Sequence, residues 1–254
     1  MNTPRTPRWT IALAVVPIFA LAGCQLGGAP TGGDADIIRI GYVTPQTGPL
    51  AAFGEADSFV LDQMKTYFDE NGITTADGVK HDVEIISKDT QSDSVRAGEV
   101  ASELILQDEV DLILVSSTPD TTNPVSDQCE ANQVVCISTV APWQAWYFGR
   151  GGTPDAGFKY TYHFFWGLED AESVYSEIWK VASDATSVGL LLPNDADGNA
   201  WADEANGFPP FITGLGLTPD YAGAYPNGTT DFSAQISQFK NNGDKILTAI
   251  PIPP

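Results

Sequence analysis

Positively charged residues are scarce in this sequence. It has 12 lysines and arginines against 33 aspartates and glutamates, which gives a formal net charge of −21. Nucleic acids and anionic membrane surfaces would repel such a chain, which argues against both as partners. The acidic surplus favours solubility and says little about a small ligand.

The residues that most enzymes and metal sites need are also few. The only two histidines, His81 and His163, lie far apart and away from the cysteines, so no metal-ligand spacing is present. The chain has no Gly-x-Ser-x-Gly motif, no neighbouring histidine pair and no phosphate-binding glycine loop. We therefore predict no catalytic residues, no cofactor and no metal, and the function of an enzyme is disfavoured.

One segment superficially resembles a calcium loop. Asp195, Asp197 and Asn199 alternate as calcium ligands do, but Ala200 and Asn206 stand where such loops have glycine and glutamate. The alternatives are a loop that faces a ligand and a turn that caps a helix.

Long apolar runs are absent after the first two dozen residues. Arg5 and Arg8 precede an apolar run at 10–22 that ends in small residues, as in a bacterial export signal. The run is too short to span the ~30 Å hydrocarbon core of a membrane. We predict that residues 1–23 are a signal peptide, which is removed.

The cleavage region is more specific than that of a general export signal. Leu21-Ala22-Gly23-Cys24 resembles the bacterial lipobox, which implies that Cys24 is lipidated and becomes the new N-terminus. The alternative is an ordinary cysteine beside a normal cleavage site. An acylated terminus holds a protein on a membrane without spanning it. Residues 24–36, rich in glycine, are predicted to be a flexible tether to an extracytoplasmic, lipid-anchored protein.

Only two other cysteines remain, Cys129 and Cys136. An even number of cysteines fits an oxidising compartment. Residues 125–132 look helical and 134–139 look like a strand, so a disulfide would join the end of a helix to the next strand. We predict this disulfide, with two buried free thiols as the alternative.

From residue 37 onward, strand-like and helix-like segments alternate. The first series has strands at 37–44, 82–87, 110–115 and 134–139, with apolar residues at helical spacing in 55–71 and 94–107. The second has strands at 160–166, 187–193, 220–225 and 245–250, with helices at 171–182, 202–214 and 232–241. The alternation predicts an α/β fold of parallel sheets flanked by helices.

A loop rich in glycine, proline and aromatic residues at 141–157 separates the two series. It predicts two lobes, 37–150 and 151–254, joined by a hinge. Residues 251–254 follow a strand with no closing helix, so we expect the second lobe to continue beyond residue 254.

Three segments carry a family resemblance. Residues 40–54 look like an opening strand with a Thr-Gly-Pro turn and a following aromatic and glycine. Ser116-Ser117-Thr118 and Ser138-Thr139 each follow or end an apolar strand. Phe232-Ser233-Ala234-Gln235-Ile236 precedes a lysine and a strand. From residue 37 to 254 the chain resembles the type I periplasmic binding proteins, in particular the branched-chain amino-acid-binding (leucine/isoleucine/valine) group of ABC importers.

The resemblance implies a two-lobed solute-binding protein that closes around an amino acid or a related small polar solute and delivers it to an ABC permease. The hydroxyl-rich segments fall where the family binds the amino and carboxylate groups of its ligand. This chain departs from the family at 193–201, where a Tyr-Gly is usual, so the solute is left as an amino acid or similar. The alternative function is a ligand-sensing receptor subunit of the same fold.

Physical reasoning supports the same site. Ligands of open α/β sheets bind beyond the carboxyl ends of the strands, where loops present hydroxyls and backbone N–H groups. The predicted ligand-binding residues are Phe53, Ser116, Ser117, Thr118, Ser138, Thr139, Trp143, Asp195 and Asp197. Helix capping and turn formation are the alternative for the polar residues, and core packing is the alternative for the aromatic ones.

Overall fold

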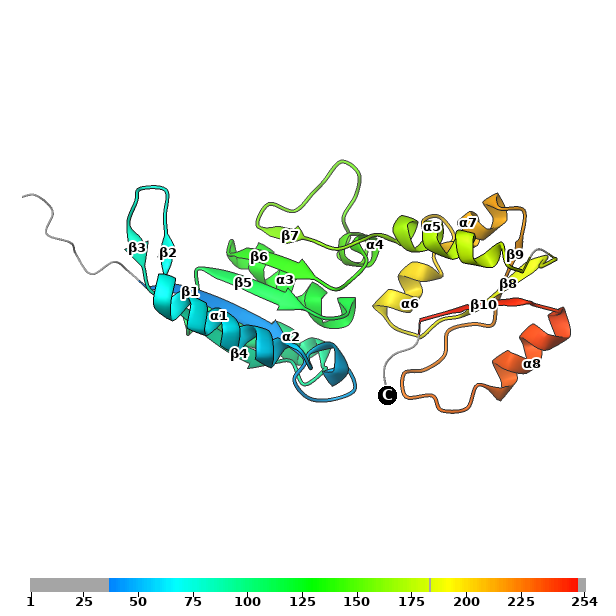
Figure 1. Ribbon diagram of the computed structural model, residues 1–254, viewed down its shortest axis with the longest axis horizontal. Coiled ribbons are helices and arrows are strands. Elements are labelled where there is room, and N and C mark those ends of the chain that lie inside the picture. The colour runs from blue at the N-terminus through cyan, green and yellow to red at the C-terminus, as the bar shows by residue number, and fades with distance from the viewer. Residues whose placement is uncertain (1–36, 183, 251–254) are drawn as a thin grey trace, which may run out of the picture. The chain divides into compact units, whose positions relative to one another are not determined.

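A sheet of five parallel strands forms the first part of the fold (Figure 1). The computed structural model describes residues 37–182 and 184–250. In spatial order the strands are β4 (Val83–Asp89), β1 (Ile38–Thr44), β5 (Leu112–Ser116), β6 (Val135–Thr139) and β7 (Thr161–His163). Because the strands are parallel, their carboxyl ends meet at one edge of the sheet, where the predicted hydroxyl-rich segments begin.

Two helices cover one face of this sheet. They are α2 (Ser94–Leu106) and α3 (Pro119–Asn132). The side chain of Asp93 caps α2 by accepting a hydrogen bond of 2.7 Å from the N–H of Arg96. The core between helices and sheet consists of Val43, Ala97, Val100, Ala101, Leu104, Val110, Ile113, Val115, Val125, Cys129 and Cys136. This packing fixes the start of α3 directly beyond the end of β5.

The opposite face is only partly covered. It carries α1 (Asp57–Asn71) after the short helix η1 (Ala51–Phe53), and a small hairpin of β2 (Ile73–Thr74) and β3 (Lys80–His81) follows α1. Leu61 is the one residue of α1 that is buried, while Phe59 is 69% exposed. The apolar spacing in α1 therefore predicted the helix correctly, but it does not mark a buried face.

Exposed apolar side chains continue across the sheet on that side. Val135 and Ile137 of β6 and Tyr162 of β7 are exposed, whereas the alternate residues of β6 are buried under α3. On α2, Val95 is also exposed, although its spacing places it with the apolar residues of that helix.

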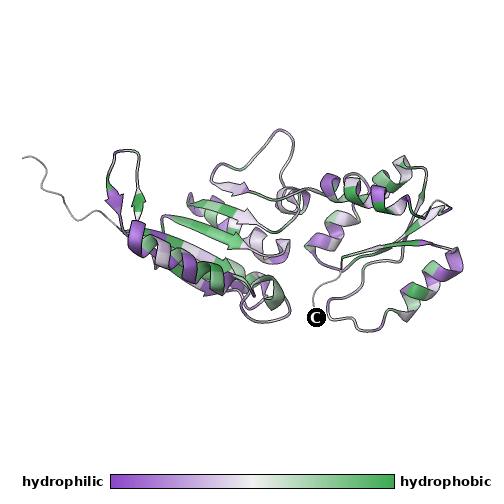
Figure 2. Ribbon diagram, viewed as in Figure 1, coloured by the Kyte–Doolittle hydropathy of each residue, from purple (hydrophilic) through white to green (hydrophobic). Residues whose placement is uncertain are grey.

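A second, three-stranded parallel sheet has the order β10 (Ile246–Ala249), β8 (Ser187–Leu191), β9 (Thr218–Tyr221). One face packs against α5 (Leu168–Trp179), α6 (Ala196–Trp201) and α7 (Phe208–Gly214). The core there includes Leu168, Trp179, Val188, Leu190, Leu192, Trp201, Phe208 and Ile212. Figure 2 shows apolar residues along the strands of both sheets.

The other face of the second sheet receives α8 (Ser233–Asn242). Its Phe239 ring lies against Gly189 of β8, where a Cβ atom would come within 2.9 Å of the ring. The glycine thus allows the close approach of helix and sheet.

Three sequence-based assignments need correction. The helix expected at 202–214 begins only at Phe208, as α7, because Pro209 and Pro210 suit only the first turn of a helix, and the short helix α6 ends before this range at Trp201. The strand expected at 220–225 lies at Thr218–Tyr221. The strand expected at 160–166 is β7, which pairs with β6 and so belongs to the first sheet rather than to the second series.

The predicted disulfide is also corrected, because Cys129 and Cys136 are free thiols. Both are fully buried where α3 packs on β6. The contact with the Cys136 thiol, together with burial, raises the pKa of Cys129, which favours the protonated thiol. The alternative of two buried free thiols is the one found.

The predicted signal peptide, Cys24 and the tether lie outside the described residues, as do 251–254. Within the described part of the chain, every helix is too short or too polar to cross a membrane.

Candidate functional site

Three consecutive residues with hydroxyl groups, 116–118, lie at the carboxyl end of β5. The first of them, Ser116, forms hydrogen bonds within the first lobe. The Ser116 hydroxyl lies 3.2 Å from the Tyr42 hydroxyl and donates a 3.3 Å hydrogen bond to Asp57. Asp57 also accepts from Thr44. Mainly through burial, the pKa of Tyr42 is raised to about 12, so its hydroxyl stays neutral. Ser116 therefore helps to hold α1 against the sheet.

The next two hydroxyls have no partner. Ser117 is fully buried and Thr118 is half-buried, and among the described residues neither hydroxyl oxygen has a hydrogen-bond partner. Thr118 is the N-cap residue of α3, yet its side chain makes no capping bond. A buried polar atom without a partner costs about 1–3 kcal/mol, so these two atoms are free to bind a ligand.

Ser138 and Thr139, at the end of β6, serve the fold instead. His163 donates through Nε2 to the Ala141 carbonyl at 2.6 Å, so its Nδ1 accepts from the Ser138 hydroxyl at 2.8 Å. Thr139 donates to the carbonyl of Phe164 at 2.7 Å. Burial lowers the pKa of His163, which keeps the ring neutral. Both hydroxyls thus fasten β7 and the segment after it.

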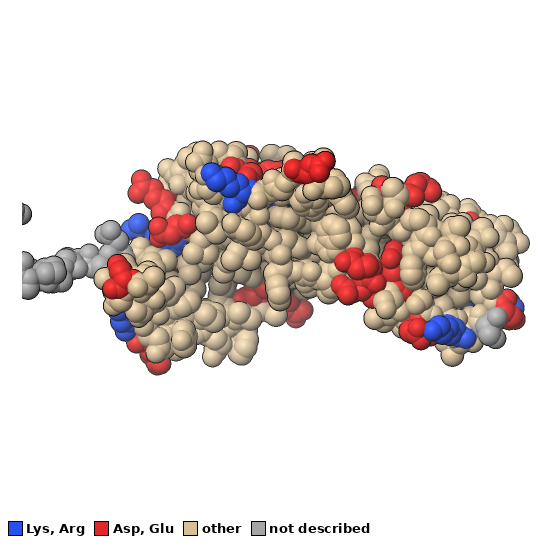
Figure 3. Space-filling model, turned by 90° about the horizontal axis from the view of Figure 1, so that it is seen from above, with Lys and Arg blue, Asp and Glu red and all other residues tan. Residues whose placement is uncertain are grey.

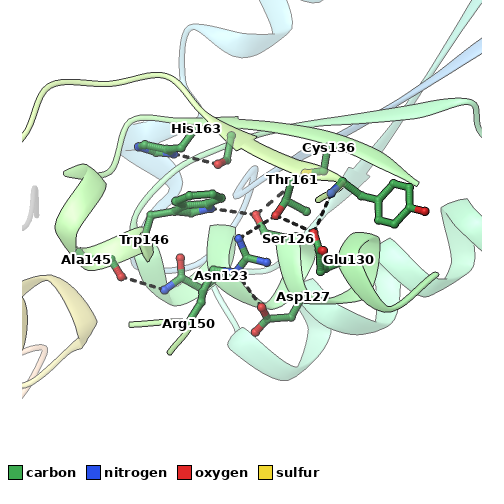
Figure 4. A network of polar contacts seen from close by, with 12 residues as sticks. Asn123, Ser126, Asp127, Glu130, Cys136, Ala145, Trp146, Arg150, Thr161 and His163 are labelled. Atoms are coloured by element: carbon green, nitrogen blue, oxygen red, sulfur yellow. Dashed lines mark hydrogen bonds and ion pairs between the residues drawn. The ribbon is translucent and has the colours of Figure 1, made fainter. Parts of the chain in front are cut away.

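A network around Arg150 fixes this side of the first lobe (Figure 4). The fully buried guanidinium pairs with Asp127 of α3 at 2.7 Å and donates to the Thr161 hydroxyl at 3.0 Å. It also lies over the rings of Trp146 and Phe158, at 4.7 and 3.8 Å from their centroids. These contacts join the second half of α3 to β7 and to α4 (Trp143–Tyr147).

The two predicted aromatic residues, Trp143 and Phe53, lie on different elements, α4 and η1. Trp143 donates from its indole to Glu169 of α5 at 2.8 Å, and Gln144 donates to the same carboxylate. Hydrogen bonding to Trp143 and Gln144 outweighs burial and lowers the pKa of Glu169. Phe53 ends η1 and is half-buried, and no aromatic ring among the described residues stacks on it. Trp143 therefore joins α4 to α5.

The two predicted aspartates of the second lobe sit at the start of α6. Asp195 caps the helix, accepting a 2.8 Å hydrogen bond from the N–H of Gly198. Asp197 stands in the first turn, and one of its carboxylate oxygens is buried without a partner. The capping turn that the sequence left as an alternative is thus present at Asp195.

The structure adds a residue that sequence analysis missed. Asp120, in the first turn of α3, accepts a 3.3 Å hydrogen bond from the N–H of Ala196. The start of α3 and the start of α6 therefore touch, although 76 positions separate these two residues. The only local signal was an acidic residue in the first turn of a helix, which is typical of helix capping.

A cavity of about 370 Å³ lies beside this contact, between α4 and α6. Its lining residues are Gln144, Ala145, Phe148, Gly149, Ala196, Asn199, Ala200, Asp203 and Asn206. None of them was among the predicted site residues, because the cavity is formed by segments that are distant in sequence.

The family model for periplasmic binding proteins matches residues 37–254, which include every residue that the structure describes. The chain belongs to the periplasmic binding protein family. The resemblance seen in the sequence is thereby confirmed, as is the predicted α/β class with parallel sheets flanked by helices. Members of this family are extracytoplasmic solute-binding proteins rather than enzymes. No curated protein sequence matches this binding protein significantly.

Several solved structures share its fold. The isoleucine complex of the branched-chain amino acid binding protein LivJ from Streptococcus pneumoniae is 20% identical, with a TM-score of 0.60, and the match covers 84% of this chain and 57% of that one. The leucine binding protein LivK from Thermotoga maritima is 18% identical, with a TM-score of 0.68 and coverage of 84% and 55%. A solute binding protein from Rhodopseudomonas palustris with bound 4-hydroxybenzoate is 18% identical, with a TM-score of 0.65 and coverage of 85% and 54%. This binding protein thus spans about half the length of these structures.

Proposed function

We propose that this chain is the lipid-anchored solute-binding component of an ABC importer and that it binds a small polar solute between its two lobes. The observation that carries the proposal is the pair of buried hydroxyls without partners, Ser117 and Thr118, at the carboxyl end of β5. They immediately precede the turn of α3 that contacts α6 of the second lobe. This is where open α/β folds bind ligands.

The proposed mechanism is hinge closure without covalent chemistry. A solute that contacts both lobes favours the closed form, and the permease distinguishes that form from the open one. The network around Arg150 is consistent with this role, because it joins α3 to β7 within the first lobe. Lipidation at Cys24 would keep the protein beside the permease.

A thermal-shift screen of the full chain tests solute binding. The screen contains amino acids, amides, amines, urea, hydroxybenzoates and short peptides. We expect one class to raise the melting temperature by several degrees through mass action. Ser117→Ala and Thr118→Val should reduce that rise, while Ser237→Ala, an exposed serine of α8, should not. A folded chain that responds to no compound class would contradict the proposal.

The anchor has its own test. In a bacterial host that processes lipoproteins, we expect the chain to fractionate with membranes and Cys24→Ser to release it. Equal fractionation of both forms would rule out the lipid anchor while leaving solute binding untouched.

A further inference from the structure

Three aspartates from the two lobes meet at the contact between α3 and α6. Asp120 stands in the first turn of α3, Asp195 caps α6, and Asp197 follows in the first turn of α6. The hydrogen bond of 3.3 Å from the Ala196 N–H to Asp120 places the two turns against each other. The carboxylates therefore share one partly buried region, and the question is what neutralises them.

No basic side chain does so. Among residues 37–182 and 184–250, none of the three aspartates forms an ion pair with lysine, arginine or histidine. Burial and then the charge of Asp195 raise the pKa of Asp120, and burial, Asp195 and Asp120 raise that of Asp197 to about 7. On the face drawn in Figure 3, acidic side chains cover more of the surface than basic ones. The region is thus negative and uncompensated.

A second, independent observation indicates that something binds here. Two of the buried polar atoms without partners belong to Ser117 and Thr118, just before Asp120, and two more belong to Asp197 and Trp201 of α6. Ser117 is fully buried and Trp201 is 4% exposed. The Trp201 indole N–H lies close enough to Asp197 to lower its pKa, but not in hydrogen-bond geometry. Native proteins leave few buried polar atoms unpaired, so this concentration indicates that a ligand supplies the missing partners.

The arrangement also limits the charge of that ligand. An anionic group would gain from the N-terminus of α3, but the Asp120 carboxylate already occupies the first turn of that helix. A bare metal ion does not fit either, because no group of three or more acidic, histidine or cysteine side chains in the described residues is arranged to hold one. Carboxylates that are close but do not converge on one point suit a larger cation with several N–H donors.

We propose that the solute bound between α3 and α6 is an organic cation with protonated amino or guanidino groups, held by Asp120 and Asp197, with the hydroxyls of Ser117 and Thr118 as further partners. The inference rests on the proposed function of solute binding and specifies its ligand class. It separates this chain from the solved structures that hold isoleucine or 4-hydroxybenzoate.

Calorimetric titration of the full chain tests the inference. The probes are putrescine and arginine as cations, isoleucine as a zwitterion and 4-hydroxybenzoate as an anion, all at the same ionic strength. We expect putrescine or arginine to bind and the other two to bind at least tenfold more weakly. Asp197→Asn and Asp120→Asn should each weaken the cation by tenfold or more. Asp69→Asn, which removes an exposed carboxylate on α1, should leave its affinity unchanged.

The outcomes distinguish the two proposals. If isoleucine or 4-hydroxybenzoate binds and the cations do not, the ligand class is wrong while solute binding stands. Cation binding that survives both aspartate substitutions in folded variants, as judged by circular dichroism, would overturn the assignment of these residues. If no probe binds and the wider thermal-shift screen is also silent, the proposed function itself fails.

Discussion

Replacing Asp197 by asparagine should stabilise the protein without ligand at alkaline pH. The pKa of this carboxyl is raised from 3.8 to about 7, mainly by burial and then by Asp195, so ionisation in the folded state is unfavourable. Between these values the folded chain binds more protons than the unfolded chain, and the free energy of unfolding therefore falls as pH rises. Above pH 7 the full penalty applies, about 4 kcal/mol for three pKa units. An asparagine leaves one buried polar atom without a partner, at a cost of about 1–3 kcal/mol, so the net gain should be about 1–3 kcal/mol.

Urea unfolding of the full chain at pH 8 and pH 4 measures this gain. We expect Asp197→Asn to have the larger free energy of unfolding at pH 8 and to lose that advantage at pH 4, where the wild-type carboxyl is protonated. Asp69→Asn should change little at either pH, because that carboxylate is exposed. A variant that is equal to or less stable than the wild type at pH 8 would refute the reasoning.

Four further outcomes test the fold. Arg150→Met should destabilise the chain by about 3 kcal/mol in urea, because it removes the ion pair with Asp127, the hydrogen bond to Thr161 and two aromatic contacts; a loss below 1 kcal/mol would show that the network is not structural. Gly189→Val should cost about 1–3 kcal/mol or more through collision with a neighbouring ring, and an unchanged melting temperature would contradict this. Cys129 and Cys136 should react with an alkylating reagent only after denaturation and without prior reduction, as counted by mass spectrometry. Burial lowers the pKa of His163, so protonation should destabilise the fold as pH falls below 6.5; His163→Gln should remove this dependence, as measured by unfolding between pH 5 and 8.

Most elements of the fold were predictable from the local pattern, and the errors have local causes. The apolar run that ends in Ser116 and the spacing in 94–107 identified β5 and α2 to within about two residues. The break between α6 and α7 was missed, although Gly207 followed by Phe208 and two prolines indicates the start of a helix. The apolar residues of α1 show that periodicity predicts a helix but does not predict which side chains of that helix are buried.

The candidate site was harder to predict because its parts are distant in sequence. The hydroxyls at 116–118 and the aspartates at 195 and 197 were found from their places after strands. Which hydroxyl is free was not predictable, because Ser116 is engaged by Tyr42 and Asp57 through tertiary contacts. Asp120 was missed for the same reason, since its partner lies in another lobe.

The net charge of −21 does not by itself indicate a ligand, because the effect of each acidic side chain depends on its surroundings. An acidic side chain that faces water, a basic neighbour or a helix N-terminus says nothing about a ligand. Asp108, for example, pairs with Lys88 at 3.0 Å, and Asp93 caps α2. Asp120 and Asp197 differ because burial and their shared negative neighbour, Asp195, oppose their ionisation, and no cation from the described chain relieves them. Two buried carboxylates destabilise the protein without ligand, and a bound cation would reverse this loss of stability. A gain in stability and a loss of cation affinity should therefore appear together in the same variant, Asp197→Asn.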